Sequence, residues 1–253
     1  MTSADDYKQA RSLAVEIARS FAAPRFYADL RRDREISRRL LLTDPVLERS
    51  RQIVIARDER FGHGLRHSEK VATDAGAIVH EETERTGNSP AQTRRAMFLV
   101  QLASLLHDIR RRVPNHARQS AILAAEILED FPVDEAERQW IVRSIENHEA
   151  FVEPAALESE VGQLLSDALY DADKFRWGPD NFTETLWEMV SSEIPIRALL
   201  AHFPKGMEGV RRIAGTFRSE TGMKYGPEFI EIGIAIGERL YEELLERFPL
   251  DEE

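Results

Sequence analysis

Residues 96–112 read AMFLVQLASLLHDIRRR: an almost uninterrupted apolar run precedes an imidazole, a carboxylate and three guanidinium groups. A helix that is hydrophobic on nearly all sides is buried inside a protein, so residues 96–106 predict a central helix. His107 and Asp108 then emerge from the core at the end of that helix. Burying a charge is costly unless the charge is paired or coordinates a metal. These two side chains therefore need partners, and the other histidines are the candidates.

The composition is that of a globular protein, with 42% hydrophobic and 31% charged residues. General nucleic-acid and anionic-membrane binders carry a basic surface, whereas this chain has a net charge of −11, so we expect neither a nucleic-acid polymer nor a membrane as partner. The absence of cysteine excludes disulfides, thiolate zinc sites and cysteine nucleophiles. We find no signal-peptide pattern and no apolar run of the ~20 residues that a membrane span needs, which predicts a cytoplasmic protein. No feature of the sequence indicates an oligomeric state.

Helical spacing of apolar residues runs through the chain, and no alternating strand pattern of any length is present. Capping boxes from Ser89 to Gln92 and from Asp134 to Glu137 mark two helix starts. The prediction is an all-α fold, with one domain over residues 7–250. In the C-terminal part the expected helices are Pro195–His202, Gly206–Phe217 and Pro227–Phe248.

Four histidines fall on successive expected helices, and two aspartates end apolar helices. They are His67, His107, His116 and His148, with Asp108 and Asp173. A single histidine on an apolar face is usually a core residue with a satisfied hydrogen bond. Four of them together with two carboxylates would make a very costly core if they were unpaired. A metal centre satisfies all six at once, because borderline divalent ions take neutral imidazoles and carboxylates as ligands.

The order of these residues resembles that of the HD-domain metal-dependent phosphohydrolases. The resemblance rests on RHSEKVA at residues 66–72, on His107-Asp108, and on Ala172-Asp173-Lys174, and it covers about residues 61–177. His116 in HARQSA and His148 in IENHE resemble the additional ligands of the two-metal branch of that family. The resemblance implies an all-α HD-domain helical bundle, to which the N- and C-terminal flanks add helical extensions.

The resemblance also implies a role for each matching residue. The first metal would be held by His67, His107, Asp108 and Asp173, and the second by His116 and His148, with Asp108 bridging. Such nitrogen and oxygen ligands suit two divalent ions chosen from Mn, Fe, Co, Ni and Zn. Asp171 would orient a ligand or move a proton, and a plain carboxylate at a helix end explains it equally well.

The sequence departs from the family pattern after the ligand pair. The familiar His-Asp-Ile-Gly-Lys run is replaced by HDIRR, so the usual lysine is missing, and Arg110, Arg111 and Arg112 supply positive charge instead. We expect at least one of them to bind the substrate phosphate, because arginine makes bidentate, permanently charged contacts. The alternative is three solvated loop arginines. The Gly-Tyr-Pro element of cyclic-dinucleotide phosphodiesterases is absent and Glu149 follows His148, which counts against a cyclic dinucleotide as substrate.

Further residues near the expected ligands are weaker candidates. Arg66 and Lys174 each adjoin an expected ligand and would also bind phosphate. His63 lies between two glycines, where it would be a ligand, a proton donor or part of a flexible loop near the site. We expect residues 181–250 to wall the substrate pocket.

Three functions fit this ligand set. In a phosphohydrolase, a metal-activated water attacks a phosphate ester of a nucleotide or another small phosphorylated metabolite. In a di-iron oxygenase of the same superfamily, dioxygen is used to cleave a carbon–carbon or carbon–phosphorus bond. A degenerate domain would bind a nucleotide or a partner without catalysis, but such domains usually lose ligands, and here all six positions are filled. The arginines that follow the ligand pair, and the frequency of hydrolases in the family, favour hydrolysis over oxygenation, so we predict a phosphohydrolase.

Overall fold

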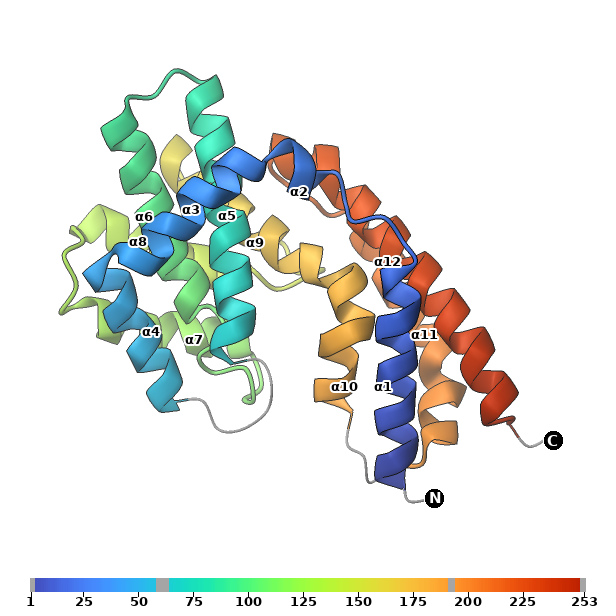
Figure 1. The fold of residues 1–253 in the computed structure, drawn as a ribbon. Coiled ribbons are helices and arrows are strands. Elements are labelled where there is room, and N and C mark those ends of the chain that lie inside the picture. The colour runs from blue at the N-terminus through green and yellow to red at the C-terminus, as the bar shows by residue number, and fades with distance from the viewer. Residues whose placement is uncertain (1–2, 58–63, 191–193, 251–253) are drawn as a thin grey trace. The chain divides into compact units, whose positions relative to one another are not determined.

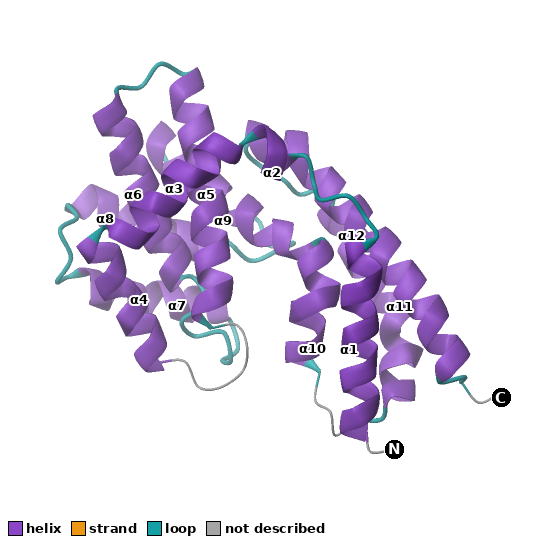
Figure 2. Ribbon diagram, in the orientation of Figure 1, coloured by secondary structure: helices purple, strands orange, loops and turns teal. Residues whose placement is uncertain are grey.

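The computed structural model of the chain describes residues 3–57, 64–190 and 194–250. Every regular element in these ranges is helical, and none of them contains a strand (Figure 2). The all-α prediction is confirmed. No described helix has both the length and the apolar character needed to cross a bilayer. His63 and its expected loop lie outside the described residues.

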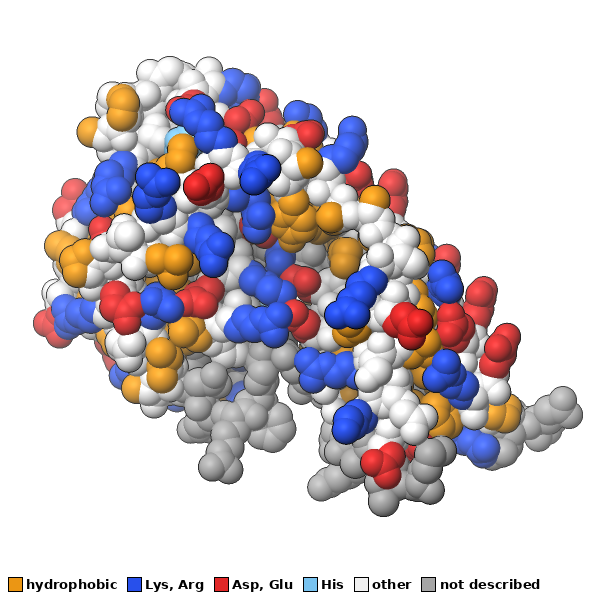
Figure 3. All heavy atoms as spheres, viewed as in Figure 1, with side chains coloured by type: hydrophobic (Ala, Val, Ile, Leu, Met, Phe, Trp, Pro, Cys, Tyr) orange, Lys and Arg blue, Asp and Glu red, His pale blue; other side chains and the backbone are white. Residues whose placement is uncertain are grey.

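The chain divides into two compact units. The histidine unit comprises residues 26–173 and 217–224, and the flanking unit comprises the described parts of residues 1–25, 174–216 and 225–253. The expectation of one domain over residues 7–250, with residues 181–250 walling its pocket, stays a prediction. On the face shown in Figure 3, acidic and basic side chains are interspersed.

The histidine unit is built around one buried helix. Its helices are α2 (Phe26–Asp29), α3 (Arg31–Thr43), α4 (Pro45–Arg57), α5 (Leu65–Arg85), α6 (Pro90–Leu106), α7 (His116–Leu128), α8 (Glu135–Glu146) and α9 (Glu160–Lys174) (Figure 1). Every side chain of α6 from Ala96 to Leu106 is buried, as the apolar run predicts. Both predicted capping boxes are confirmed, at the start of α6 and at the start of α8.

Helices α3, α5 and α6 meet closely at a glycine. A Cβ atom on Gly76 of α5 would overlap the hydroxyl of Ser37 in α3. The side-chain amide of Gln101 in α6 donates to the Ser37 carbonyl at 2.8 Å and to its hydroxyl at 2.9 Å. The Ser37 hydroxyl in turn donates to the carbonyl oxygen of Thr73 in α5 at 2.8 Å. Ser37 of α3 thus bonds to both α5 and α6, the two helices that carry His67 and His107 to the same end of the unit.

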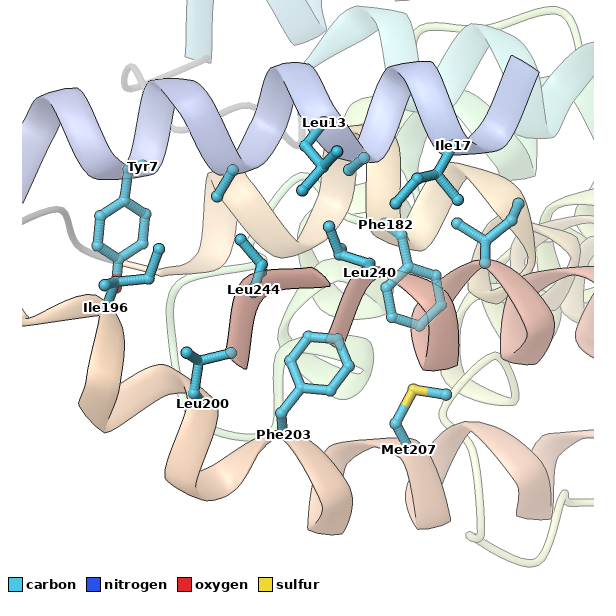
Figure 4. Close-up of a cluster of buried hydrophobic side chains, with 13 residues drawn as sticks. Tyr7, Leu13, Ile17, Phe182, Ile196, Leu200, Phe203, Met207, Leu240 and Leu244 are labelled. Carbon is cyan, nitrogen blue, oxygen red and sulfur yellow. The ribbon is translucent and has the colours of Figure 1, made fainter. Parts of the chain in front are cut away.

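The flanking unit has a hydrophobic core of its own (Figure 4). Its elements are α1 (Ser3–Arg19), a 3₁₀ turn (Phe175–Trp177), a π-helical turn (Asn181–Thr185), α10 (Leu186–Met189), α11 (Ile196–Ile213) and most of α12 (Glu220–Arg247). The buried side chains labelled in Figure 4 are Tyr7, Leu13, Ile17, Phe182, Ile196, Leu200, Phe203, Met207, Leu240 and Leu244.

Two prolines of the C-terminal part lie inside helices. Pro204 is within α11 and Pro227 is within α12, so the predicted break before Gly206 and the predicted helix start at Pro227 are wrong. An interior proline removes a backbone hydrogen bond and costs about 3 kcal/mol. Continuing α11 through Pro204 buries both Phe203 and Met207 at 5% exposure, and each such burial contributes about 1.5–3 kcal/mol. Packing therefore outweighs the local preference of proline.

Candidate metal centre

Six side chains of the histidine unit come together where its helices begin or end. His67 and His116 lie at helix starts, in the first turn of α5 and at the first residue of α7. His107 caps the C-terminus of α6 and is followed by Asp108. His148 lies two residues beyond α8, and Asp173 is the penultimate residue of α9. The apolar middles of the helices pack in the core while their polar ends meet. His148 was expected inside a helix, but α8 ends at Glu146 and His148 lies in the following turn.

The first group of ligand atoms consists of His67 Nε2, His107 Nε2, Asp108 Oδ2 and Asp173 Oδ1. His67 Nε2 lies 3.2 Å from Asp173 Oδ1, 3.4 Å from His107 Nε2 and 3.8 Å from Asp108 Oδ2. His107 Nε2 lies 3.6 Å from Asp108 Oδ2 and 3.7 Å from Asp173 Oδ1. Two ligands that are each about 2.0–2.2 Å from one ion lie about 3.0–3.5 Å apart. The group is therefore close to the spacing of a coordination sphere.

The second group shares Asp108 with the first. His116 Nε2 and His148 Nε2 are 3.2 Å apart, and they lie 3.6 Å and 3.5 Å from Asp108 Oδ1. Asp108 thus directs Oδ2 to the first group and Oδ1 to the second. Its Oδ1 atom is buried and has no hydrogen-bond partner. A buried carboxylate oxygen without a donor is costly, and a cation at the second group would satisfy it.

Two of the histidines are oriented by the backbone. His107 Nδ1 lies 2.6 Å from the carbonyl oxygen of Ser104, and His148 Nδ1 lies 2.6 Å from that of Ile145. A carbonyl oxygen can only accept, so Nδ1 carries a proton in both rings, and Nε2 is the atom that can bind a metal in the neutral ring. Metal-binding histidines in proteins make this same second hydrogen bond.

The charges in the two groups influence each other strongly. Burial would lower the pKa of His107, but the negative charges of Asp108 and Asp173 outweigh it and the pKa is raised. Burial would raise the pKa of Asp108, but His107 above all keeps this pKa well below its usual value. Burial, helped by Arg111, lowers the pKa of His116 to about 4. An ionised Asp108 and a neutral His116 are the protonation states in which these groups bind metals.

Residues 64–178, which include all six side chains, match the family model of the HD domain. The chain contains an HD domain. This superfamily consists mostly of metal-dependent hydrolases. Comparisons with curated proteins and with solved structures gave no match. The assignment made from the sequence is confirmed for the HD domain, while the two-metal arrangement stays a prediction.

One of the expected phosphate-binding residues contacts the centre of the HD domain. Arg111 Nη1 lies 2.8 Å from His116 Nε2 and 3.9 Å from Asp108 Oδ1. Its neighbours Arg110 and Arg112 are exposed. Phosphate binding by all three arginines stays a prediction.

The two weaker candidates differ in burial. Arg66 is exposed in the first turn of α5, one residue before His67. Lys174 follows Asp173 directly and is buried, with 4% exposure. Phosphate binding by Arg66 and Lys174 also stays a prediction.

Asp171 is bound to a segment outside the matched range. Its Oδ1 accepts from the amide of Arg218 at 2.9 Å, and its Oδ2 accepts from the amide and the hydroxyl of Ser219 at 2.8 and 2.7 Å. Burial raises the pKa of Asp171 to about 7, against the opposing effect of these hydrogen bonds. Ser219 in turn caps α12, since its hydroxyl accepts from the amide of Gly222 at 2.8 Å. Asp171 therefore attaches the start of α12 to the helix that carries Asp173, and its part in proton transfer stays a prediction.

Arg218 is a residue that the sequence does not single out. Its Nη1 donates to the carbonyl oxygen of Asn147 at 2.9 Å, and its guanidinium carbon lies 3.5 Å from the ring centre of Tyr170. Asn147 precedes His148, and Tyr170 lies on the helix that carries Asp173. Arg218 thus links the two segments that bring these ligands to the centre. Because 71 positions separate Arg218 from Asn147, no spacing in the sequence could reveal the contact.

A third His/carboxylate group occurs among the described residues, between α3 and α5. His80 Nδ1 lies 2.7 Å from Asp33 Oδ1, and His80 Nε2 lies 3.7 Å from Glu84 Oε1. Glu84 Oε2 also lies 3.5 Å from Arg32 Nη1. The group is explained as a buried histidine–carboxylate pair that joins two helices.

Proposed function

We propose that the chain is a metal-dependent phosphohydrolase whose HD domain holds two divalent cations. The proposal rests on Asp108, whose two carboxylate oxygens face different pairs of histidines. Its Oδ2 lies beside His67 and His107, and its Oδ1 lies beside His116 and His148. A carboxylate in this arrangement can ligate a different cation with each oxygen.

The nitrogen and oxygen donors fit borderline divalent ions. The first cation would be bound by His67, His107, Asp108 and Asp173, and the second by His116, His148 and Asp108. Mn, Fe, Co, Ni and Zn all accept such ligands. Two cations in such a centre supply an activated water nucleophile at neutral pH and neutralise charge on the phosphate oxygens.

The side chains around the ligands prepare the site for an anion. The carbonyl groups behind His107 and His148 hold the two rings in the tautomer that ligates through Nε2. Arg111 places a permanent positive charge beside the second group, where it would bind phosphate oxygens with two hydrogen bonds. Arg110, Arg112, Arg66 and Lys174 are the further candidates for this contact.

Asp171 would act as a positioning residue. Three donors from residues 218 and 219 hold its carboxylate, two residues before the ligand Asp173. The substrate that best fits this centre is a phosphate ester of a nucleotide or of another small phosphorylated metabolite. The missing Gly-Tyr-Pro element still counts against a cyclic dinucleotide.

Metal analysis followed by a substrate screen tests the proposal. The purified protein should contain up to two divalent ions per chain and hydrolyse phosphomonoesters, nucleotides or phosphodiesters with or without oxygen. Asp108→Ala should lose the metal and the activity, whereas Asp130→Ala, which removes an exposed carboxylate, should retain both. Oxygen consumption that depends on iron and substrate would identify an oxygenase instead. Full activity of Asp108→Ala in a metal-verified sample would refute the assignment.

A further inference from the structure

Arg111 contacts one of the proposed metal ligands directly. Its Nη1 lies 2.8 Å from Nε2 of His116 and 3.9 Å from Oδ1 of Asp108. A guanidinium has five N–H donors and no acceptor. The imidazole nitrogen must therefore accept in this contact, so its only lone pair is engaged by Arg111.

A cation at the second group needs that same lone pair. An imidazole nitrogen binds such an ion at about 2.0–2.1 Å through its one lone pair, so His116 Nε2 cannot at the same time accept a hydrogen bond from the guanidinium nitrogen 2.8 Å away. Two positive charges at this separation also repel each other in a partly buried site. Arg111 and a second cation therefore exclude one another at His116.

We infer that Arg111 couples the binding of the second cation to the binding of the substrate phosphate, an inference that rests on the binuclear function proposed above. The Arg111 side chain is 35% exposed, so it can turn away from His116 toward solvent when the cation binds. A phosphate on the cations then offers the displaced guanidinium a bidentate partner. Without phosphate, the guanidinium competes with the second cation for His116. With phosphate, the displaced guanidinium binds the phosphate and so stabilises the form in which the second cation is bound.

The coupling has a thermodynamic consequence that can be measured without turnover. Phosphate should increase the affinity for the second cation, and the second cation should increase the affinity for phosphate by the same factor, because binding linkage is reciprocal. The first cation should be affected less than the second, since Arg111 contacts His116 and the Asp108 oxygen of the second group.

The test is Mn²⁺ binding to the full chain, measured by calorimetry and by the electron paramagnetic resonance of free Mn²⁺, with and without inorganic phosphate. Arg111→Met keeps most of the side-chain length and removes the donors. Arg111→Lys keeps the charge but loses the paired N–H donors that make a bidentate contact. Arg118→Met is the matched control, because Arg118 is exposed on α7 two residues after His116. Circular dichroism checks that each variant is folded.

We expect the wild type to bind its second Mn²⁺ at least about tenfold more weakly than the first, and phosphate to reduce that difference. Arg111→Met should bind the second ion about tenfold more tightly than the wild type and lose the phosphate effect, Arg111→Lys should be intermediate, and Arg118→Met should match the wild type. Two ions bound with the same affinities in wild type and Arg111→Met would overturn the inference and leave the binuclear centre intact. A single ion in every variant, with or without phosphate, would overturn the binuclear proposal itself.

Discussion

The carboxylate of Asp171 has a structural effect that can be separated from any catalytic one. Asp171→Ala should lower the free energy of unfolding by about 3 kcal/mol. The change leaves the amide of Arg218 and both donors of Ser219 without their acceptor. Hydrogen bonds to a charged group contribute about 1.5–3 kcal/mol each, and a carboxylate at a helix N-terminus adds about 0.3–1 kcal/mol.

An opposing contribution reduces this loss. Burial raises the pKa of Asp171 to about 7 even though these three hydrogen bonds lower it, so a large share of the molecules carries a neutral carboxyl group at pH 7. Hydrogen bonds to a neutral group contribute only about 0.5–1.5 kcal/mol each. Three hydrogen bonds at this lower strength amount to about 3 kcal/mol, which is the stabilisation that alanine should remove.

Urea unfolding followed by circular dichroism measures the effect, with a chelator present so that metal binding does not contribute. Asp167→Ala is the control on the same helix, since Asp167 accepts from the side chain of Gln163; we expect it to change stability by about 1 kcal/mol or less. Ser219→Ala removes the hydroxyl that contacts both Asp171 and the amide of Gly222. The double variant Asp171→Ala with Ser219→Ala should lose less free energy of unfolding than the sum of the two single variants, because the two side chains share one interaction. A loss below about 1 kcal/mol for Asp171→Ala, or strict additivity of the two changes, would refute this account of the cap.

Three further changes test other parts of the structure. Asp108→Ala should weaken the binding of both cations by at least about 100-fold, because it removes a shared ligand and not merely a supporting hydrogen bond; equilibrium dialysis with metal analysis measures this. Gly76→Ala should destabilise the chain by about 2 kcal/mol in urea unfolding, since its Cβ would overlap Ser37 in the α3–α5 contact. Arg95→Ala should cost about 1 kcal/mol at pH 7, where its partly exposed ion pair with Glu137 is screened by solvent. The hydrogen bond from Arg95 lowers the pKa of Glu137, so this difference should shrink as the pH falls below the ordinary glutamate value of 4.5, which thermal unfolding at both pH values can check.

The helices were predictable from the sequence because the interactions that form them are local. The capping boxes at Ser89 and Asp134 satisfy backbone groups within one turn, and the apolar run before His107 marks a helix that has to be buried. The helix break predicted before Gly206 is wrong for the opposite reason. Helix α11 continues through Pro204 because Phe203 and Met207 are buried against residues distant in the chain, which no local pattern contains.

For the candidate site, the chain order of the histidines and aspartates was enough to name the residues that meet. The order did not reveal that Asp108 divides its two oxygens between two groups, that Arg111 contacts His116, or that Asp171 and Arg218 tie the start of α12 to the segments bearing Asp173 and His148. The amino-acid sequence alone determined the helical class and the identity of the ligand candidates, because periodicity, caps and residue chemistry are properties of neighbouring positions. The tertiary structure decided which atom of each side chain contacts which partner, since those contacts depend on how separate helix ends are oriented in space.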